Sequence, residues 1–268
     1  MGNVFQKMLF GISPLIALLF PQTVHAQGVL YVSNLGQNPT GSAAVSSDSW
    51  VAQTIVTGSS SAGYVLNAVQ LLMAPAWGTP SGFAVSLYSK TGDPHSLHIP
   101  GDSPQSNLAD LSGPDPAAGG IFNYSASGLV LSPSTFYFVV VAAATPATSG
   151  AYIWSAADTF TQSNGFTIDS SYFSSTNGSS WTWHPRQNVF QLGIYATTLP
   201  PPGLIVVTNG PASIKILWPN LGTYTLQQNM DLATTNWVTS SYPVTNNILT
   251  NFCTVAPTAG NLFFRLKL

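Results

Sequence analysis

Short apolar runs with the period of a β-strand follow one another along the chain after its first 26 residues. Residues 83–88 alternate between two faces, as a half-buried strand requires, and residues 65–73 are apolar on nearly both faces. Residues 135–142 are almost wholly apolar, which predicts a central strand buried on both sides, and residues 151–154 and 189–195 predict two more strands. Clusters of Gly, Pro, Ser and Asn separate these runs, and none of them has helical periodicity. The pattern therefore predicts an all-β fold of the β-sandwich or jelly-roll class.

A proline-rich stretch divides the chain into two units. Pro200, Pro201 and Pro202 stand together, and proline holds an extended spacer because it cannot donate to a sheet. We expect a β-sandwich domain over 27–198, a linker over 199–203 and a small C-terminal β domain over 204–268. The second unit ends in a clean alternation, with Leu262, Phe264, Leu266 and Leu268 on one face, which predicts a sandwich-like module of immunoglobulin or fibronectin III type. Such a small unit without disulfides is marginal alone, so it is expected to lean on the first domain or on a partner.

The N-terminus has the pattern of a secretory signal peptide. Lys7 precedes an apolar run of about 13 residues, which is followed by the small-residue ending Val24-His25-Ala26. This run is shorter than the roughly 20 residues that a membrane-spanning helix needs. We therefore expect residues 1–26 to be a signal peptide, removed before Gln27, and the protein to be secreted or held at the cell surface or in the periplasm. No transmembrane segment is expected after cleavage.

Charge is scarce in this chain. It has 6 Lys and Arg residues and 8 acidic residues, all of them Asp, in a total of 268. Nucleic-acid binding requires clustered Lys and Arg, so nucleic acid is excluded as a partner, and docking on anionic membranes is disfavoured for the same reason. Because 45% of the residues are hydrophobic, the chain can still bury a core. Cys253 is the only cysteine, so no internal disulfide forms, and a small buried apolar residue is the favoured interpretation over a nucleophile.

The stretch from about Ser49 to Ala196 resembles the choice-of-anchor R domain of bacterial surface proteins. The resemblance rests on the ordered segments AQTIVTG, LNAVQLLM, FAVSLYS followed by GDP, LVLSPSTFYFVVVAA, YIWSAA and SSWTWHPRQNVFQLGIYAT. It implies an exported protein without an established enzymatic activity, so there are no catalytic residues to carry over.

The tail from about Ile214 to Leu268 resembles a C-terminal β-module of secreted proteins from Verrucomicrobia-like bacteria. The resemblance rests on IKILWPNLGTYTLQQNMDLATTNWVTS and on the terminal NLFFRLKL. No sorting tail with an apolar helix and a basic cluster follows this strand. A sortase-like anchor is therefore unsupported, and the module is the expected carrier of anchoring or secretion.

Aromatic residues are the main ligand-binding candidates, because a secreted β-sandwich can stack sugar rings on flat aromatic faces. Trp181 and Trp183 are two residues apart and project from one face of a strand. His184 and Tyr172 complete the predicted ligand-binding set. Core packing is the alternative for every aromatic residue, and it is the favoured interpretation for Trp154. Trp77 and Tyr152 are the remaining aromatic candidates for ligand binding.

Metal sites and catalytic motifs are poorly supported. Asp93, His95 and His98 gather in one loop with Asp102 nearby, but a zinc site needs three or four ligands, and a solvated loop is favoured. Without Glu, a glycoside hydrolase would depend on scattered Asp residues that converge only in three dimensions. No nucleophile elbow and no phosphate-binding loop is present.

We therefore predict a protein that is not an enzyme and uses no cofactor or metal. The favoured function is a structural, adhesive or matrix-attachment role at the cell surface or outside the cell. The alternatives are a carbohydrate-binding protein that uses exposed Trp residues, and a hydrolase with Asp residues converging in space. Extracellular polysaccharide or other surface proteins are the expected partners.

Overall fold

The computed structural model describes residues 28–95, 102–158, 165–185, 189–200, 202–209, 213–220, 224–247, 250–256 and 261–267. These residues form strands and loops, with no helix among them, so the predicted all-β class is confirmed. It follows that no described segment is a helix able to cross a membrane. The predicted signal peptide and His98 lie outside the described residues.

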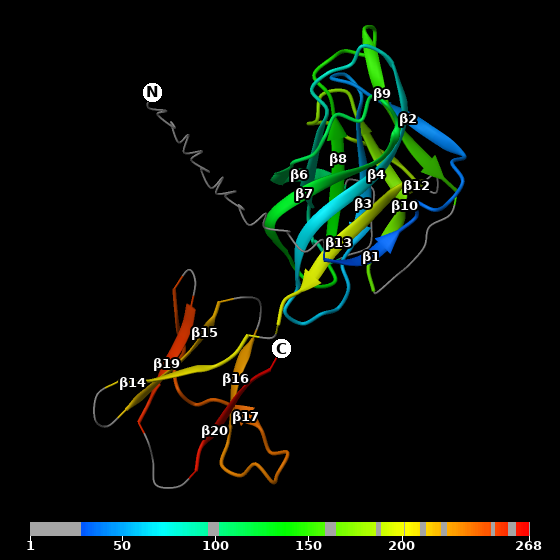
Figure 1. Ribbon diagram of the computed structural model, residues 1–268. Helices are drawn as coiled ribbons and strands as arrows, with labels where there is room; N and C mark the ends of the chain where they lie inside the picture. Colours follow the sequence, from blue (N-terminus) through cyan, green and yellow to red (C-terminus); the bar gives the residue numbers. More distant parts are fainter. Residues whose placement is uncertain are drawn as a thin grey trace, which may run out of the picture.

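The first unit is a sandwich of a seven-stranded and a six-stranded antiparallel sheet (Figure 1). The seven-stranded sheet holds β1 (Val29–Ser33), β2 (Gly41–Val45), β4 (Tyr64–Gly78), β7 (Gly120–Leu131), β9 (Gly150–Ala157), β12 (Val189–Phe190) and β13 (Leu192–Thr198). The six-stranded sheet has the order β11 (Thr182–His184), β10 (Thr167–Ser175), β3 (Trp50–Val56), β8 (Phe136–Ala142), β5 (Ala84–Lys90) and β6 (Pro104–Leu111). The main core lies between the two sheets and contains residues of both.

Strand β8 is the predicted central strand, and all of its residues are buried. It lies between β3 and β5. Val139 and Val141 belong to the core between the sheets, whereas Phe138 and Val140 belong to a smaller cluster on the other face. The outer face of this sheet is therefore covered, which explains why the whole segment is apolar.

Strand β4 is apolar on nearly both faces because its pleat changes phase. Tyr64, Leu66 and Ala68 are buried, and then Val69 and its alternate neighbours are buried instead. Against β13, Asn67 is an extra residue in a β-bulge between Leu66 and Ala68, and against β7 the register shifts at the same place, where residues 126–128 oppose Asn67. A bulge reverses which face the following residues point to, so two alternating patterns overlap in one segment.

Residues 189–195 form two strands rather than the single strand that the sequence predicts. β12 pairs with β9, whereas β13 pairs with β1 and β4, and Gln191 stands at the break. The Gln191 side chain is fully buried and donates to the carbonyls of Asn34 and Gln37. These two bonds from the amide nitrogen tie the break to the loop after β1, while Gln191 Oε1 is buried without a hydrogen-bond partner among the described residues.

The second unit is a smaller sandwich of four and three strands. One sheet has the order β14 (Ile205–Thr208), β15 (Ile214–Pro219), β19 (Thr250–Val255) and β18 (Thr245–Asn246), and the other has the order β17 (Val238–Thr239), β16 (Thr225–Asn229) and β20 (Phe263–Lys267). The first order is that of the ABED sheet of an immunoglobulin-type sandwich. Ile216, Trp218, Leu226 and Cys253 are buried in its core, and Leu262, Phe264 and Leu266 pack against them as predicted.

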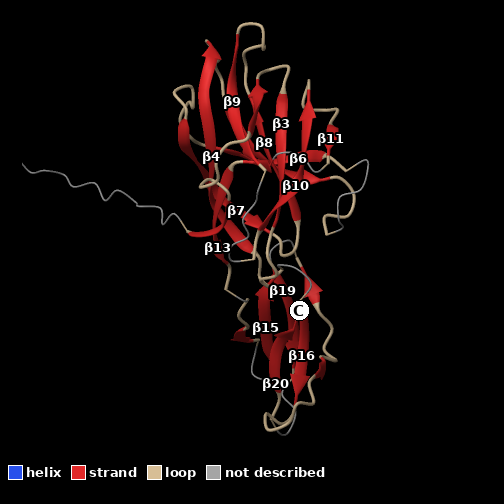
Figure 2. Cartoon of the chain, turned by 90° about the vertical axis from the view of Figure 1, so that its right-hand side faces the viewer, coloured by secondary structure: helices blue, strands red, loops and turns tan. Residues whose placement is uncertain are grey.

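The two sandwiches lie end to end, as Figure 2 shows. The loop between β3 and β4 contacts both the second sandwich and the start of the linker. The Tyr224 hydroxyl donates to the Ser61 carbonyl at 2.8 Å, and the Leu199 amide donates to the Gly63 carbonyl at 3.1 Å.

Candidate functional site

The four predicted ligand-binding residues all lie on one hairpin, formed by β10 and β11 at an edge of the six-stranded sheet. The turn between these strands is built locally. The Asn177 side chain accepts hydrogen bonds from the Ser179 and Ser180 amides, and Gly178 has a φ of 72°. The sequence Asn-Gly therefore specifies the turn that brings Trp181, Trp183 and His184 back beside Tyr172.

These four residues are divided between the two faces of the hairpin. Trp183 lies opposite Phe173 in the strand pairing, and His184 lies opposite Tyr172. Neighbouring residues on a strand point to opposite faces, so Trp183 and His184 project in opposite directions. The structure thus brings the four candidates together in the chain path but not on a single surface.

Trp181 and Trp183 cover the outer face of the six-stranded sheet. Both are half-buried and pack against a cluster that contains Ala52, Phe138, Val140 and Phe173. Both indole Nε1 atoms are buried and have no hydrogen-bond partner among the described residues. Packing on the sheet therefore occupies much of the aromatic surface of both residues.

His184 and Tyr172 lie on the other face of the hairpin and contact each other. Their rings stack at 4.4 Å with an angle of 11° between the planes, and Tyr172 meets Phe190 edge to face at 5.0 Å. His184 Nε2 lies 2.8 Å from the Ser174 hydroxyl, with which it shares a hydrogen bond. Burial lowers the pKa of His184 from its ordinary 6.5, so the neutral ring is favoured.

The other aromatic candidates lie apart from this hairpin. Trp154 and Tyr152 are fully buried in the main core, which confirms the core interpretation of Trp154. The Trp154 ring stacks on Phe190 at 4.7 Å. Trp77 remains 49% exposed near the end of β4. Of these three residues, only Trp77 presents its ring to solvent.

A groove of about 260 Å³ runs beside the β10–β11 hairpin. Its lining consists mostly of hydroxyl side chains, with one carboxylate: Asp48, Ser49, Ser174, Ser175, Thr176, Ser180 and Thr182. The Asp48 carboxylate accepts hydrogen bonds from Ser46 Oγ at 2.7 Å and from the Ala147 amide at 2.9 Å. These hydrogen bonds, that of Ser46 first, lower the pKa of Asp48. Sequence reasoning missed Asp48 because it reaches the groove from the turn before β3, and only the pairing of Trp50 with Ser175 places that turn beside the hairpin.

The carboxylates of the first sandwich serve as hydrogen-bond acceptors within the fold. Several cap turns: Asp93 accepts from the His95 amide, Asp115 from the Ala117 amide and Asp169 from the Ser171 amide. Asp158 accepts from Thr40 at 2.8 Å. The three turn caps are the short-range roles that Asp takes in loops.

Three carboxylates bind side chains of other residues. Asp110 accepts hydrogen bonds from Ser86 and Asn107, both at 2.7 Å, and these lower its pKa. Asp115 also accepts from the Tyr152 hydroxyl at 2.7 Å. Asp102 pairs with Lys90 at 2.9 Å, and both side chains are buried. In the second sandwich, Asp231 caps a turn by accepting from the Ala233 amide.

The Asp93–His95 loop has the contacts of a structural turn. His95 Nδ1 lies 2.8 Å from the Ser134 carbonyl, and the Asp102 carboxylate forms an ion pair with the Lys90 ammonium. No three His, Cys or Asp side chains of the described ranges lie close enough together to hold a metal ion. The favoured interpretation of this segment, a loop without a metal, stays a prediction because His98 is outside those ranges.

Comparison with protein-family models finds none that matches the chain, and searches of curated proteins and of solved structures return no match either. The resemblance to the choice-of-anchor R domain stays a prediction from the sequence.

Proposed function

We propose that this chain is a non-catalytic, exported surface or extracellular protein with a structural or adhesive role in attachment. The observation that carries the proposal is that all eight Asp carboxylates accept hydrogen bonds or ion pairs from the fold itself. A carboxylate that closes a turn is held away from the two roles that hydrolysis requires, a proton donor and a nucleophile or base.

The direction of the pKa shifts supports the same conclusion. A general acid needs a carboxyl group whose pKa is raised, so that it keeps its proton near neutral pH. The pKa values of Asp48 and Asp110 shift the other way, because hydrogen bonds from Ser46 and Ser86 favour their ionised forms. Among the described tyrosines whose pKa values shift, the pKa is raised, most of all for Tyr124 and Tyr152. Their phenol groups therefore remain neutral.

The scarcity of charge bears on the kind of partner. With only 5% charged residues, the chain offers little long-range attraction to a charged surface. Its polar surface consists mainly of hydroxyl and amide side chains, which form short-range hydrogen bonds. A neutral extracellular polymer or a protein surface of low charge matches this chemistry.

The test combines binding with product analysis. The chain from residue 28 onward is incubated with insoluble polysaccharides and extracellular matrix, and both co-sedimentation and newly formed reducing ends are measured. We expect binding without products. Release of products that Asp115→Asn or Asp48→Asn abolishes, while the control Asp231→Asn does not, would contradict the proposal.

A second candidate function is glycan binding at the groove beside the β10–β11 hairpin. The observation that favours it is the hydroxyl-rich lining, to which Ser174, Ser180 and Thr182 of the hairpin contribute. Substitution of the Trp residues is a poor test because they also cover the sheet. Ser180→Ala with Thr182→Val alters the lining instead, and Ser179→Ala, in the same turn but outside the lining, is the matched control. Loss of binding in the double variant alone supports this site, and equal binding by all three proteins excludes it.

A further inference from the structure

The second sandwich contains a cavity of about 280 Å³, lined by residues from both of its sheets. Trp218 and Asn251 come from one sheet, where they lie opposite each other on β15 and β19. Leu226 comes from β16 in the other sheet, and Val244 precedes β18. The cavity therefore opens between the sheets, at the end of the module where Tyr224 contacts the first sandwich.

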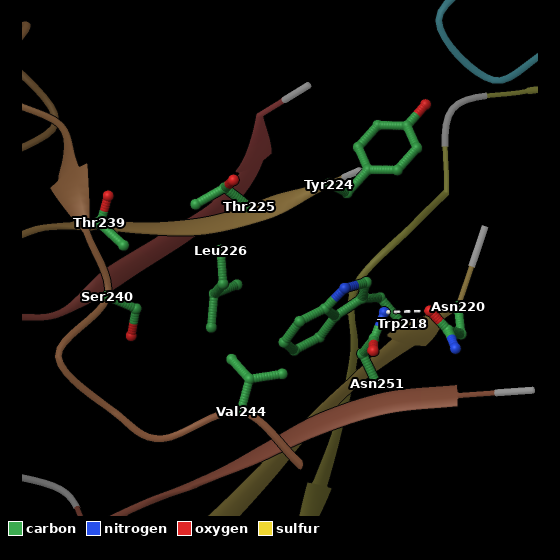
Figure 3. A pocket seen from close by; sticks show the side chains of 9 residues that line it. All are labelled: Trp218, Asn220, Tyr224, Thr225, Leu226, Thr239, Ser240, Val244 and Asn251. Atoms are coloured by element: carbon green, nitrogen blue, oxygen red, sulfur yellow. Dashed lines mark hydrogen bonds between the residues drawn. The ribbon is translucent and has the colours of Figure 1, made fainter. Parts of the chain in front are cut away.

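A buried hydrogen-bond donor in the wall of this cavity has no partner. Trp218 is 1% exposed, and its Nε1 atom is buried without a hydrogen-bond partner among the described residues. Figure 3 shows the indole between the Asn220–Asn251 pair and the side chains of Leu226 and Val244. A buried N–H group without an acceptor is costly, and buried Trp side chains usually have one. Within the described part of the module, no acceptor is supplied to this donor.

The two asparagine side chains are held in place by each other and by the backbone. Asn251 Nδ2 donates to Asn220 Oδ1 at 3.3 Å, and Asn220 Nδ2 donates to the Asn247 carbonyl at 3.1 Å. This arrangement leaves Asn251 Oδ1 as an acceptor beside the indole. An acceptor held in a fixed position can bind a group that donates, such as a hydroxyl.

None of the described lining residues carries a charged side chain. Its polar groups are the two amides and the hydroxyls of Tyr224, Thr225, Thr239 and Ser240, while Trp218, Leu226 and Val244 supply an apolar side. Phosphates, carboxylates and amines would enter without a counter-charge, which disfavours them. A neutral molecule with several hydroxyls and an apolar face fits this lining.

The size of the cavity limits the ligand further. Because liquid water takes about 30 Å³ per molecule, the cavity has room for several waters rather than one. It lies just under the roughly 300–1,000 Å³ of sites for drug-sized ligands. A single six-membered ring with its hydroxyls is the size that remains.

We propose that this cavity binds one ring of a neutral sugar, with Asn251 Oδ1 and the lining hydroxyls on its hydroxyls and its apolar face toward Trp218, Leu226 and Val244. This proposal gives a ligand class to the attachment role proposed above. It rests on that role, because the sugar must come from outside the cell. It is independent of the Trp181–Trp183 hairpin, which lies in the other sandwich.

The test uses the chain from residue 28 onward, labelled with ¹⁵N at its seven Trp residues. The Trp218 indole cross-peak is assigned with Trp218→Phe, or by triple-resonance spectra if that core variant does not fold. The probes are cellotriose, maltotriose, xylotriose and mannotriose, with trigalacturonate as the charged analogue and uracil as a neutral ring without hydroxyls. We expect at least one neutral trisaccharide to shift the Trp218 peak, while the Trp181 and Trp183 peaks stay in place.

Variants of the two neighbouring asparagines provide the control. Asn251→Ala should weaken binding about tenfold or more, because it removes the acceptor proposed for a sugar hydroxyl and the bond that holds Asn220 in place. Asn246→Ala, which lies opposite Asn251 on β18 outside the lining, should leave affinity within about twofold. The proposal is overturned if no neutral trisaccharide moves the Trp218 peak, if uracil or trigalacturonate moves it equally, or if Asn251→Ala binds as tightly as the unaltered chain.

These outcomes are separable from those of the proposed function. Co-sedimentation with matrix by a chain whose Trp218 peak stays silent would reject the cavity and keep the attachment role. A shifted Trp218 peak together with catalytic release of products would do the reverse.

Discussion

At the scale of single residues, Gln53 shows how one buried amide compensates for an irregular strand. The pairing of β10 with β3 shifts between Ile168 and Tyr172, and the displaced carbonyls of Asp169 and Ser171 accept hydrogen bonds from Gln53 Nε2 at 2.8 and 3.1 Å. Gln53 Oε1 accepts from the Phe190 amide in the opposite sheet. We expect Gln53→Met to lower the free energy of unfolding by about 2–3 kcal/mol, since it leaves these buried groups unpaired. Urea denaturation measures the loss.

The control for this prediction is Gln70→Met, because Gln70 is only half-buried on β4. It should change the free energy of unfolding by less than about 1 kcal/mol. Equal losses in the two variants would show that Gln53 has no special role.

His184 gives the fold a pH dependence of known sign. Burial lowers the pKa of His184 from 6.5, so between the folded-state pKa and about 6.5 the unfolded chain binds more protons than the folded chain. The stability contributed by neutral His184 is therefore complete above about pH 6.5 and is lost as the pH falls toward the folded-state pKa. The thermal midpoint should be lower at about pH 5 than at about pH 8, and His184→Gln should reduce that difference. The same pH dependence in both proteins would refute the assignment.

At the scale of elements, the β10–β11 hairpin acts as a cover for the six-stranded sheet. Trp183 packs against the cluster of Phe138, Val140 and Phe173, so its removal opens apolar surface to water. We expect Trp183→Ala to cost about 2–3 kcal/mol of stability, somewhat less than for a fully buried Trp. Trp77→Ala, at a residue that is 49% exposed, should cost less than about 1 kcal/mol. Chemical denaturation of both variants decides whether Trp183 is a packing residue.

The β5–β6 hairpin is held by a buried ion pair. Lys90 Nζ lies 2.9 Å from Asp102 and also donates to the Asp93 carbonyl at 2.8 Å. Lys90→Met leaves the Asp102 charge buried, and we expect a loss of about 3–5 kcal/mol. The double variant Lys90→Met with Asp102→Leu should recover much of that loss, because it removes both charges. A double variant as unstable as Lys90→Met would show that the charges themselves are not the cause.

The elements differ in how well the sequence predicts them. Residues 135–142 are recognisable because both faces of β8 are covered, and the alternation at 262–266 is recognisable because one face of β20 meets the module core. The bulge at Asn67 and the break at Gln191 depend on partner strands from elsewhere in the chain. No local sequence pattern therefore predicts them. The candidate site follows the same rule. The spacing of Trp181 and Trp183 correctly places them on one face, but the cluster that this face covers is assembled by β3, β8 and β10.

At the scale of the whole molecule, a hydrogen bond between described residues links the second sandwich to the first. The Tyr224 hydroxyl donates to the Ser61 carbonyl at 2.8 Å, and the Pro-rich linker joins the two units along the chain. A net hydrogen bond is worth about 0.5–1.5 kcal/mol, so its loss shifts the balance between docked and undocked modules by about two- to tenfold. We expect Tyr224→Phe to broaden the distance distribution between the sandwiches in small-angle X-ray scattering, while the unfolding midpoints stay nearly unchanged.

Tyr242→Phe is the matched control for this last prediction. Tyr242 packs near Phe264, with ring centres 6.1 Å apart, inside the second sandwich. Its loss of a hydroxyl leaves the contact between the sandwiches intact. Because Tyr224 also lines the Trp218 cavity, a sugar bound there would touch the residue that docks the module. Scattering of the unaltered chain with a bound trisaccharide should then differ from that of the free chain, whereas Asn251→Ala should show no difference. Identical scattering with and without the bound sugar would separate the cavity from the orientation of the modules.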